Sequence, residues 1–160
     1  MVIVSAEPIL SLEKDDMENR TKVSIFNMFH DGQFVFLERN EQEVLFEIRI
    51  DFLAELLQPE YTNFKGILRR CRECRFEPWE GATIYEDIKA INTLIRDMDI
   101  LDTQLIDEQV VINCYGMKKK EKGGDFFFCC DDIELFDQDG FPITVEKLEE
   151  LSRKSVEDVP

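Results

Sequence analysis

The stretch from Ile25 to Phe36, IFNMFHDGQFVF, constrains the fold more than any other, because it places a turn signal between two short apolar runs. Asp31 and Gly32 tolerate the positive backbone φ angles that tight turns need. Every second residue before the turn is mostly apolar, which is typical of a half-buried strand. The stretch therefore predicts a strand over residues 21–29, a turn, and a second strand over residues 33–37.

Further strands follow from the same reasoning. Residues 43–50 alternate most clearly, with Val44, Phe46, Ile48 and Ile50 on one face. This is the pattern of an antiparallel strand with one face in a core. Residues 64–76, 110–115 and 126–136 are also predicted as strands, which gives a largely antiparallel sheet of about six strands. Residues 97–107, with four aspartates and no basic residue, are predicted as a loop.

Two helices complete the predicted α+β fold. From Ile84 to Met98, apolar residues recur at spacings of three and four, which predicts a helix over residues 83–98 with one buried stripe. Thr83 and Glu86 fit a capping box at its start. Thr144 is predicted to cap a short last helix over residues 144–154. We expect one domain over residues 1–160, with residues 1–20 as an edge strand and loop or a partly mobile arm, and residues 155–160 as a frayed tail.

The charge of the chain restricts its partners. It carries 35 acidic and 19 basic residues, for a formal net charge of −16. An anionic surface repels nucleic-acid phosphate and anionic lipid, so we expect neither nucleic-acid nor membrane binding. Such a surface attracts basic proteins. Five scattered cysteines, together with no apolar run long enough for a membrane span, predict a cytoplasmic protein with reduced thiols.

The acidic residues are the predicted partner-binding residues, and charge alone motivates their choice. A solvated surface that only keeps the chain soluble is the alternative explanation. The chosen positions come from the acidic stretches around residues 97–108 and 125–150: Asp97, Asp99, Asp102, Asp131, Asp132, Asp137 and Asp139.

Two other groups carry potential chemistry. His30 beside Asp31 could act as a general base, although adjacent residues on a strand point to opposite faces. Cys71 and Cys74, with two residues between them, could ligate a metal or exchange thiols, yet the chain lacks a second pair with the spacing of a zinc site. We therefore predict no catalytic residue, no metal and no cofactor. The only remaining candidates for such a site are His30, Cys71 and Cys74.

The turn Phe29-His30-Asp31-Gly32, followed by alternating strands and an acidic body, resembles small bacterial toxin-immunity proteins. The resemblance covers residues 23–76. It implies a non-enzymatic inhibitor that binds a cognate toxin domain, often a nuclease, and blocks its active site or its access to substrate.

The leading hypothesis is thus an acidic, immunity-type inhibitor of a basic toxin. The first alternative is a structural or regulatory module that self-associates through exposed strand edges. The second alternative is a small metal- or thiol-dependent enzyme that uses His30, Cys71 and Cys74.

Overall fold

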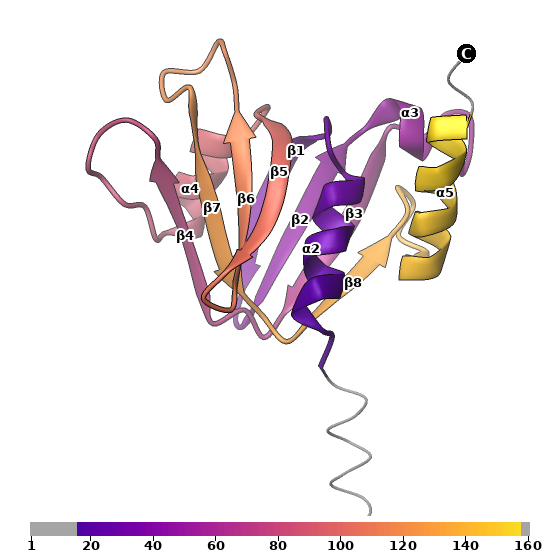
Figure 1. The fold of residues 1–160 in the computed structure, drawn as a ribbon, viewed down its shortest axis with the longest axis horizontal. Helices are drawn as coiled ribbons and strands as arrows, with labels where there is room; N and C mark the ends of the chain where they lie inside the picture. The colour runs from indigo at the N-terminus through magenta and orange to yellow at the C-terminus, as the bar shows by residue number, and fades with distance from the viewer. Residues whose placement is uncertain (1–15, 158–160) are drawn as a thin grey trace, which may run out of the picture.

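The computed structural model describes residues 16–157, which form one sheet with helices packed against it (Figure 1). The helices are α2 (Asn19–Met28), α3 (Asp51–Ala54), α4 (Ile88–Ile95) and α5 (Val145–Glu157). The strands are β1 (Gln33–Asn40), β2 (Glu43–Arg49), β3 (Asn63–Arg69), β4 (Glu73–Pro78), β5 (Asp99–Ile106), β6 (Gln109–Tyr115), β7 (Gly123–Cys129), β8 (Asp132–Phe136) and β9 (Pro142–Ile143).

The sheet is antiparallel throughout, in the order β4-β7-β6-β5-β1-β2-β3-β8-β9. The predicted α+β class is confirmed, but the described residues form nine strands rather than about six. Every pair of neighbouring strands except β1 and β5 is paired over two to seven residues.

The sheet is nearly divided between β1 and β5. These strands are in register only at Gln33 and Asp99, and then separate. Side chains from two helices bond the backbone groups that the separation leaves free. Asn27 of α2 accepts the N–H of Thr103 at 3.0 Å and donates to its carbonyl at 3.2 Å, and Asn92 of α4 accepts the N–H of Leu37 at 2.8 Å. An unpaired buried amide is costly, so these asparagines make the split sheet tolerable.

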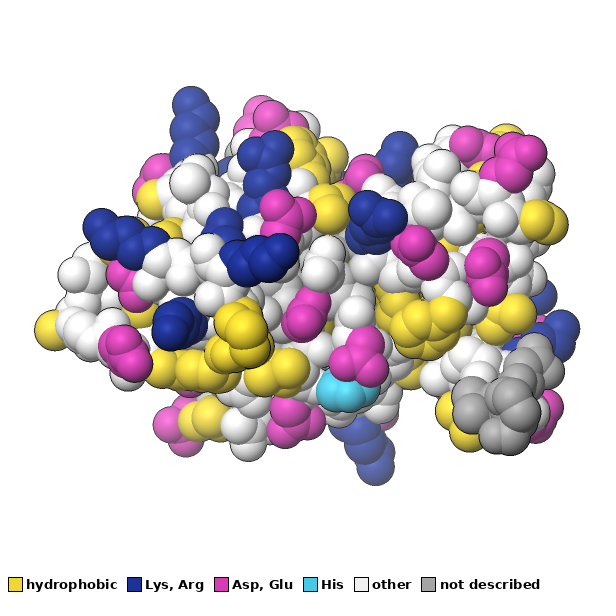
Figure 2. Space-filling view, turned by 90° about the horizontal axis from the view of Figure 1, so that it is seen from above, with side chains coloured by type: hydrophobic (Ala, Val, Ile, Leu, Met, Phe, Trp, Pro, Cys, Tyr) yellow, Lys and Arg dark blue, Asp and Glu magenta, His cyan; other side chains and the backbone are white. Residues whose placement is uncertain are grey.

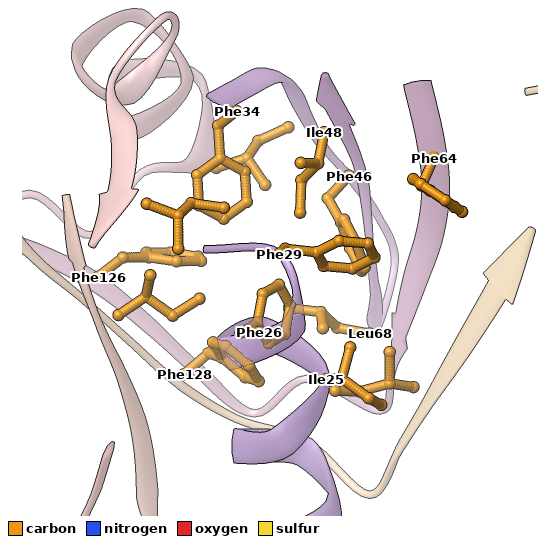
Figure 3. Packing of buried hydrophobic residues seen from close by; sticks show 14 of the residues in the cluster. Ile25, Phe26, Phe29, Phe34, Phe46, Ile48, Phe64, Leu68, Phe126 and Phe128 are labelled. Atoms are coloured by element: carbon orange, nitrogen blue, oxygen red, sulfur yellow. The ribbon is translucent and has the colours of Figure 1, made fainter. Parts of the chain in front are cut away.

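Phenylalanine side chains fill the core between α2 and the sheet (Figure 3). Phe26 of α2 contacts Phe46 of β2 and Phe128 of β7, with ring centroids 5.4 and 5.5 Å apart. One helical side chain therefore joins the two halves of the sheet across the split. Aromatic rings bury large apolar areas, so this cluster is expected to contribute much of the stability.

Gly66 of β3 faces the ring of Phe46 on the neighbouring strand. A Cβ atom at Gly66 would lie 2.1 Å from Cζ of Phe46, which is closer than two carbon atoms can approach without a shift. The ring occupies the space that a side chain at residue 66 would need, so glycine is required for this packing.

The prediction of a strand over residues 21–29 was wrong, because this segment forms α2. Its buried residues are Lys22, Ile25 and Phe26, with Phe29 next, and spacings of three and four place them on one helical face. The residues at every second position, Val23, Ile25, Asn27 and Phe29, therefore do not share a buried face, and their alternation is not that of a strand. The Asp31-Gly32 turn exists, but it joins a helix to β1.

Two predicted strands are each two strands. Residues 64–76 break at Arg70, whose φ of 50° turns the chain, and β3 and β4 lie far apart in the sheet. Residues 126–136 break after Cys129, and β7 and β8 also separate. The predicted loop over residues 97–107 was wrong as well, because most of it forms β5.

Both predicted helices exist, with different bounds at the first. Residues 83–87 precede α4, Tyr85 forms a bridge with Phe76, and the Asp87 carboxylate accepts the N–H of Ala90 instead of a Thr83–Glu86 capping box. Thr144 caps α5 as predicted, since its Oγ1 accepts the N–H of Lys147 at 3.0 Å. Helix α5 continues to Glu157, so residues 155–157 are helical. The expectations for residues 1–15 and 158–160 lie outside the described residues.

Candidate functional site

The seven predicted partner-binding aspartates lie mainly at two opposite ends of the sheet. Asp97 and Asp99 lie where β5 begins, and Asp137 and Asp139 lie in the turn between β8 and β9. We call this the carboxylate end. Asp131 and Asp132 lie at the other end, between β7 and β8, beside Arg69, Arg70 and Arg72, and we call this the arginine end. Asp102 lies along β5, exposed, next to its bulge.

The strand register places the two carboxylate pairs of the carboxylate end on one line. Asp99 is opposite Gln33 of β1, Gln33 is opposite Arg49 of β2, and Arg49 is opposite Asn63 of β3. The N–H of Asn63 donates to Oε1 of Gln138 in the β8–β9 turn at 3.0 Å. The line therefore runs across the sheet from Asp99 to the turn that holds Asp137 and Asp139.

Neutral donors hold Asp99 and Asp139 in place. Nε2 of Gln33 donates to Oδ1 of Asp99 at 2.8 Å, and the hydroxyl of Tyr61 donates to Oδ2 of Asp139 at 2.6 Å. The hydrogen bond to Asp139 raises the pKa of Tyr61 to about 12, so Tyr61 remains a neutral donor at physiological pH. These contacts fix the direction of each carboxylate without neutralising it.

Asp137 organises its own turn. Its Oδ1 accepts the N–H groups of Asp139 and Phe141, each at 2.9 Å, as aspartate commonly does in turns. Asp97 has φ of 68°, a conformation that aspartate tolerates better than most residues, and its N–H donates to the carbonyl of Phe34 at 2.7 Å. Within residues 16–157, no ion pair involves Asp97, Asp99, Asp137 or Asp139.

A hollow of about 520 Å³ lies between the two carboxylate pairs, on the outer face of β1, β2 and β3. Arg49 and Asn63, both on the line described above, form part of its wall, and Phe36 borders it with 39% of its surface exposed. The centre of the carboxylate end therefore offers an aromatic side chain and polar groups. The lining residues are Val35, Phe36, Glu47, Arg49, Thr62 and Asn63.

Figure 2 looks onto the carboxylate end from above. Acidic side chains lie in the middle, beside the single histidine, and on the right, whereas most Lys and Arg side chains gather on the left and others lie among the acidic groups. The β6–β7 loop supplies lysines on that side, from Lys118 to Lys122. The acidic surface is thus bounded by a basic region of the same chain.

The arginine end differs because its charges are paired within the chain. Asp131 binds both Arg70, with Oδ2 2.6 Å from Nε, and Arg72. Its bond to Arg72 lowers the pKa of Asp131 below its usual value. Arg69 pairs with Glu43 and forms a two-point contact with Glu134 at 2.9 and 2.8 Å. Asp132 is partly buried and forms no ion pair with another residue of the 16–157 range, and this burial raises the pKa of its carboxyl.

His30 lies at the carboxylate end, after α2. Its Nδ1 bonds the carbonyl of Leu101, and its Nε2 lies 3.4 Å from Oδ1 of Asp31. Both ring nitrogens thus face acceptors, which orients the ring at a chain turn. Asp31 does contact His30, although a strand geometry would have separated their side chains.

The cysteines gather at the arginine end, except for Cys114 in the core. Sγ of Cys71 is 3.5 Å from Sγ of Cys74, and Cys129 and Cys130 are nearby at the end of β7. Among residues 16–157, no three His, Cys, Asp or Glu side chains are arranged to hold a metal ion.

Sequence reasoning missed the neutral groups that orient the carboxylates. Gln33 and Asp99 are 66 residues apart, and Tyr61 and Asp139 are 78 apart. Glutamine and tyrosine have no spacing signal for such contacts, and the contact between Gln33 and Asp99 exists only because β1 pairs with β5.

Comparison of this chain with protein-family models, with curated proteins and with solved structures gives no match. No helix in residues 16–157 has the length and apolar character needed to cross a membrane.

Proposed function

We propose that this chain is a non-enzymatic binding protein whose carboxylate end contacts a basic protein. The observation that supports it most is the orientation of Asp99 and Asp139 by neutral donors, with no cation bound to either within the described chain. A carboxylate fixed in this way keeps its charge and loses little side-chain entropy when a partner binds.

The dimensions of the carboxylate end suit a protein partner. Four inter-strand steps of about 4.8 Å separate Asp99 from the β8–β9 turn, so the line is about 19 Å long. A standard protein interface covers about 800 Å² on each partner, a patch roughly 28 Å wide. The exposed ring of Phe36 near the centre adds the kind of aromatic contact that often dominates interface energetics.

The narrower proposal is an immunity-type inhibitor of a basic toxin in the cytoplasm. It rests on the sequence resemblance of the turn at residues 29–32 and on the charge of −16. Carboxylates can occupy the positions that a nucleic-acid phosphate takes on a basic nuclease, and opposite charges speed the encounter of the two proteins.

Self-association through strand edges has less support. The free edge of β4 is partly covered by the bridge between Phe76 and Tyr85, and β9 has two residues. An enzyme based on His30 would need a reacting group near a ring whose two nitrogens already face Leu101 and Asp31.

The test compares two variants of equal charge. One carries Asn at the carboxylate end: Asp97→Asn, Asp99→Asn, Asp137→Asn and Asp139→Asn. The control loses four exposed acids elsewhere: Asp107→Asn, Glu108→Gln, Glu146→Gln and Glu149→Gln. Asparagine retains the acceptor oxygen that Gln33, Tyr61 and the turn amides use, so the fold should persist in the first variant.

Each form would be used to capture proteins from lysate of the source cells at low and high salt, with mass spectrometry of what is retained. The proposal expects a basic protein that binds the wild type and the control but not the carboxylate-end variant. The captured protein would then be assayed with and without this chain, and an unchanged activity would contradict the inhibitor role. Equal retention by all three forms would contradict the placement of the site.

A further inference from the structure

The connection between β3 and β4 brings two thiols together at the arginine end. Cys71 lies in the connection and Cys74 on β4, and their sulfur atoms are 3.5 Å apart. A disulfide bond is about 2.05 Å long, so side-chain rotation of both residues and a small backbone adjustment could join them. Arg70, with φ of 50°, makes the turn that brings Cys71 toward β4.

Arg39 places positive charge beside this pair. Nη1 of Arg39 donates to the carbonyl of Cys71 at 3.4 Å, which places the guanidinium beside the residue. The pKa of Cys71 is lowered, first by a hydrogen bond from Cys74 and then by the charge of Arg39. The pKa of Cys74 is raised, mainly because it keeps the shared proton. One cysteine thus favours the thiolate, and the other stays a thiol within reach of it.

A hollow of about 360 Å³ leads to this pair. Cys74 forms part of its wall, and the other lining residues carry charges of both signs: Arg39, Arg72, Glu73, Arg75 and Glu86. Cys71 does not line the hollow, but its sulfur contacts that of Cys74. Both cysteines are buried, with only a small exposed fraction. A small oxidant can therefore reach the sulfur atoms more easily than a bulky one. Cys114, in contrast, is buried in the core with a raised pKa and no thiol partner among the described residues.

We propose that Cys71 and Cys74 form a peroxide-reactive thiol pair that hydrogen peroxide converts into an intramolecular disulfide. This inference does not depend on the function proposed for the carboxylate end.

The reaction proceeds in two balanced steps. The Cys71 thiolate attacks one oxygen of hydrogen peroxide, the O–O bond breaks, and hydroxide leaves and takes up a proton to give water. Cys71 is then a sulfenic acid. The sulfur of Cys74 attacks the sulfur of Cys71, the S–O bond breaks, and the oxygen leaves as a second water with the protons of both groups. The two thiols lose two electrons, and one peroxide gains them.

The test uses the whole folded chain, treated with an equal amount of hydrogen peroxide, blocked with an alkylating reagent and digested with trypsin. Trypsin cuts after Arg70, Arg72 and Arg75, so it separates the two cysteines into Cys71-Arg72 and Glu73-Cys74-Arg75. The proposal expects these two peptides joined by a disulfide, with two hydrogen atoms lost and both peptides released by a reductant.

Two variants identify the roles of the thiols. Cys74→Ser should remove the joined peptides and leave a sulfenic acid on Cys71, detected with a sulfenic-acid trapping reagent. Cys129→Ser is the matched control, because Cys129 is the most exposed cysteine and is not part of the pair. This control should yield the same joined peptides as the wild type. Peptides joined through Cys129 or Cys130 instead, or oxidation confined to Cys129, would overturn the proposal.

The rate of disulfide formation tests the surroundings of the pair. Arg39→Gln should slow it about fivefold, because the thiolate loses a neighbouring positive charge. Arg75→Gln is the matched control. Its guanidinium borders the same hollow but binds Glu77 and lies 3.9 Å from the ring centre of Phe127. Equal rates in the two variants would contradict the assigned role of Arg39.

Discussion

The carboxylate end and the arginine end use the same charged side chain in opposite ways. At the arginine end, Asp131 forms ion pairs with two guanidiniums, so its charge is balanced within the chain. At the carboxylate end, Asp99 and Asp139 accept hydrogen bonds from an amide and a phenol, which orient them and leave their charge. The difference shows that charge density along a sequence does not identify a binding surface, because the partner of each carboxylate decides whether its charge remains.

The largest expected effect is at the arginine end. Asp131→Asn should lower the free energy of unfolding by about 1.5 kcal/mol, because Arg70 and Arg72 lose their shared partner. The figure is lower than for a fully buried pair, since both guanidiniums are about half exposed. Urea denaturation at neutral pH measures it. An unchanged midpoint would show that the pairing of this end contributes nothing to stability.

The pH dependence of this effect has a defined sign. The pKa of Asp131 is lowered in the folded chain, so the pairing stabilises above the unfolded pKa of about 3.9 and is lost as the pH falls through the folded value. The difference between wild type and Asp131→Asn should therefore shrink toward zero as the pH falls below 4. Denaturation curves recorded between about pH 2.5 and pH 7 would show it. A constant difference over this range would rule out charge as its cause.

The second effect tests whether the carboxylate end also has a structural role. Asp137→Ala should cost about 1 kcal/mol, because the turn amides of Asp139 and Phe141 lose their acceptor. Asp137→Asn should cost much less, since the amide oxygen still accepts. If the two variants were equally destabilised in thermal unfolding, the charge itself would be needed and the contrast between the ends would weaken.

The third effect is a small gain in folding stability from a substitution at the arginine end. Asp132→Asn should raise stability at neutral pH by no more than about 0.5 kcal/mol, because partial burial disfavours the charged carboxyl. Since the folded pKa is raised, the stability that protonation gives is present below about pH 3.9 and is lost as the pH rises through the folded value. The gain should accordingly vanish in acid. A loss of stability at neutral pH would show that attraction to the neighbouring cations, Lys22 and Arg69, outweighs the cost of burying the carboxylate.

The smallest effect is at Asp97. Asp97→Asn should leave the unfolding midpoint unchanged, because asparagine also tolerates the positive φ and no ion pair within residues 16–157 is lost. The same substitution, combined with those of Asp99, Asp137 and Asp139, is expected to abolish partner capture. A clear loss of stability for the single variant would mean that Asp97 belongs to the fold rather than to a binding surface.

Residue patterns predicted some of this fold well. The alternation in residues 43–50 gave β2, and the stripe from Ile88 to Ile95 gave the helical core of α4, because burial on one side imposes one period. The buried residues of β3 and β4, such as Phe64, Leu68 and Phe76, are all even-numbered. The alternation therefore continues from one strand to the next, and the sequence pattern does not reveal the break between them. In β5, the bulge after Ile100 shifts the buried position from Ile100 to Thr103 and erases the alternation.

The candidate site was less predictable than the fold. The seven aspartates could be selected by charge, but their division between two ends depends on strand order, which local patterns do not encode. Arg70 and Arg72 are followed by Asp131 only about 60 residues later, and the chain has to form β7 before they can meet. The contact between Cys71 and Cys74 was not predicted either, because positions three apart on the strand expected over residues 64–76 would face opposite sides, and the turn after β3 brings the two sulfur atoms together.

The two asparagines at the split between β1 and β5 give the backbone amides of Leu37 and Thr103 an unusual dependence on the helices. In a regular sheet, an amide proton exchanges with solvent when neighbouring strands part. Here the acceptors of these two protons are side-chain oxygens of Asn92 and Asn27, carried by α4 and α2. Deuterium uptake at Leu37 and Thr103 would therefore report how often each helix lifts from the sheet, while the strands themselves stay paired.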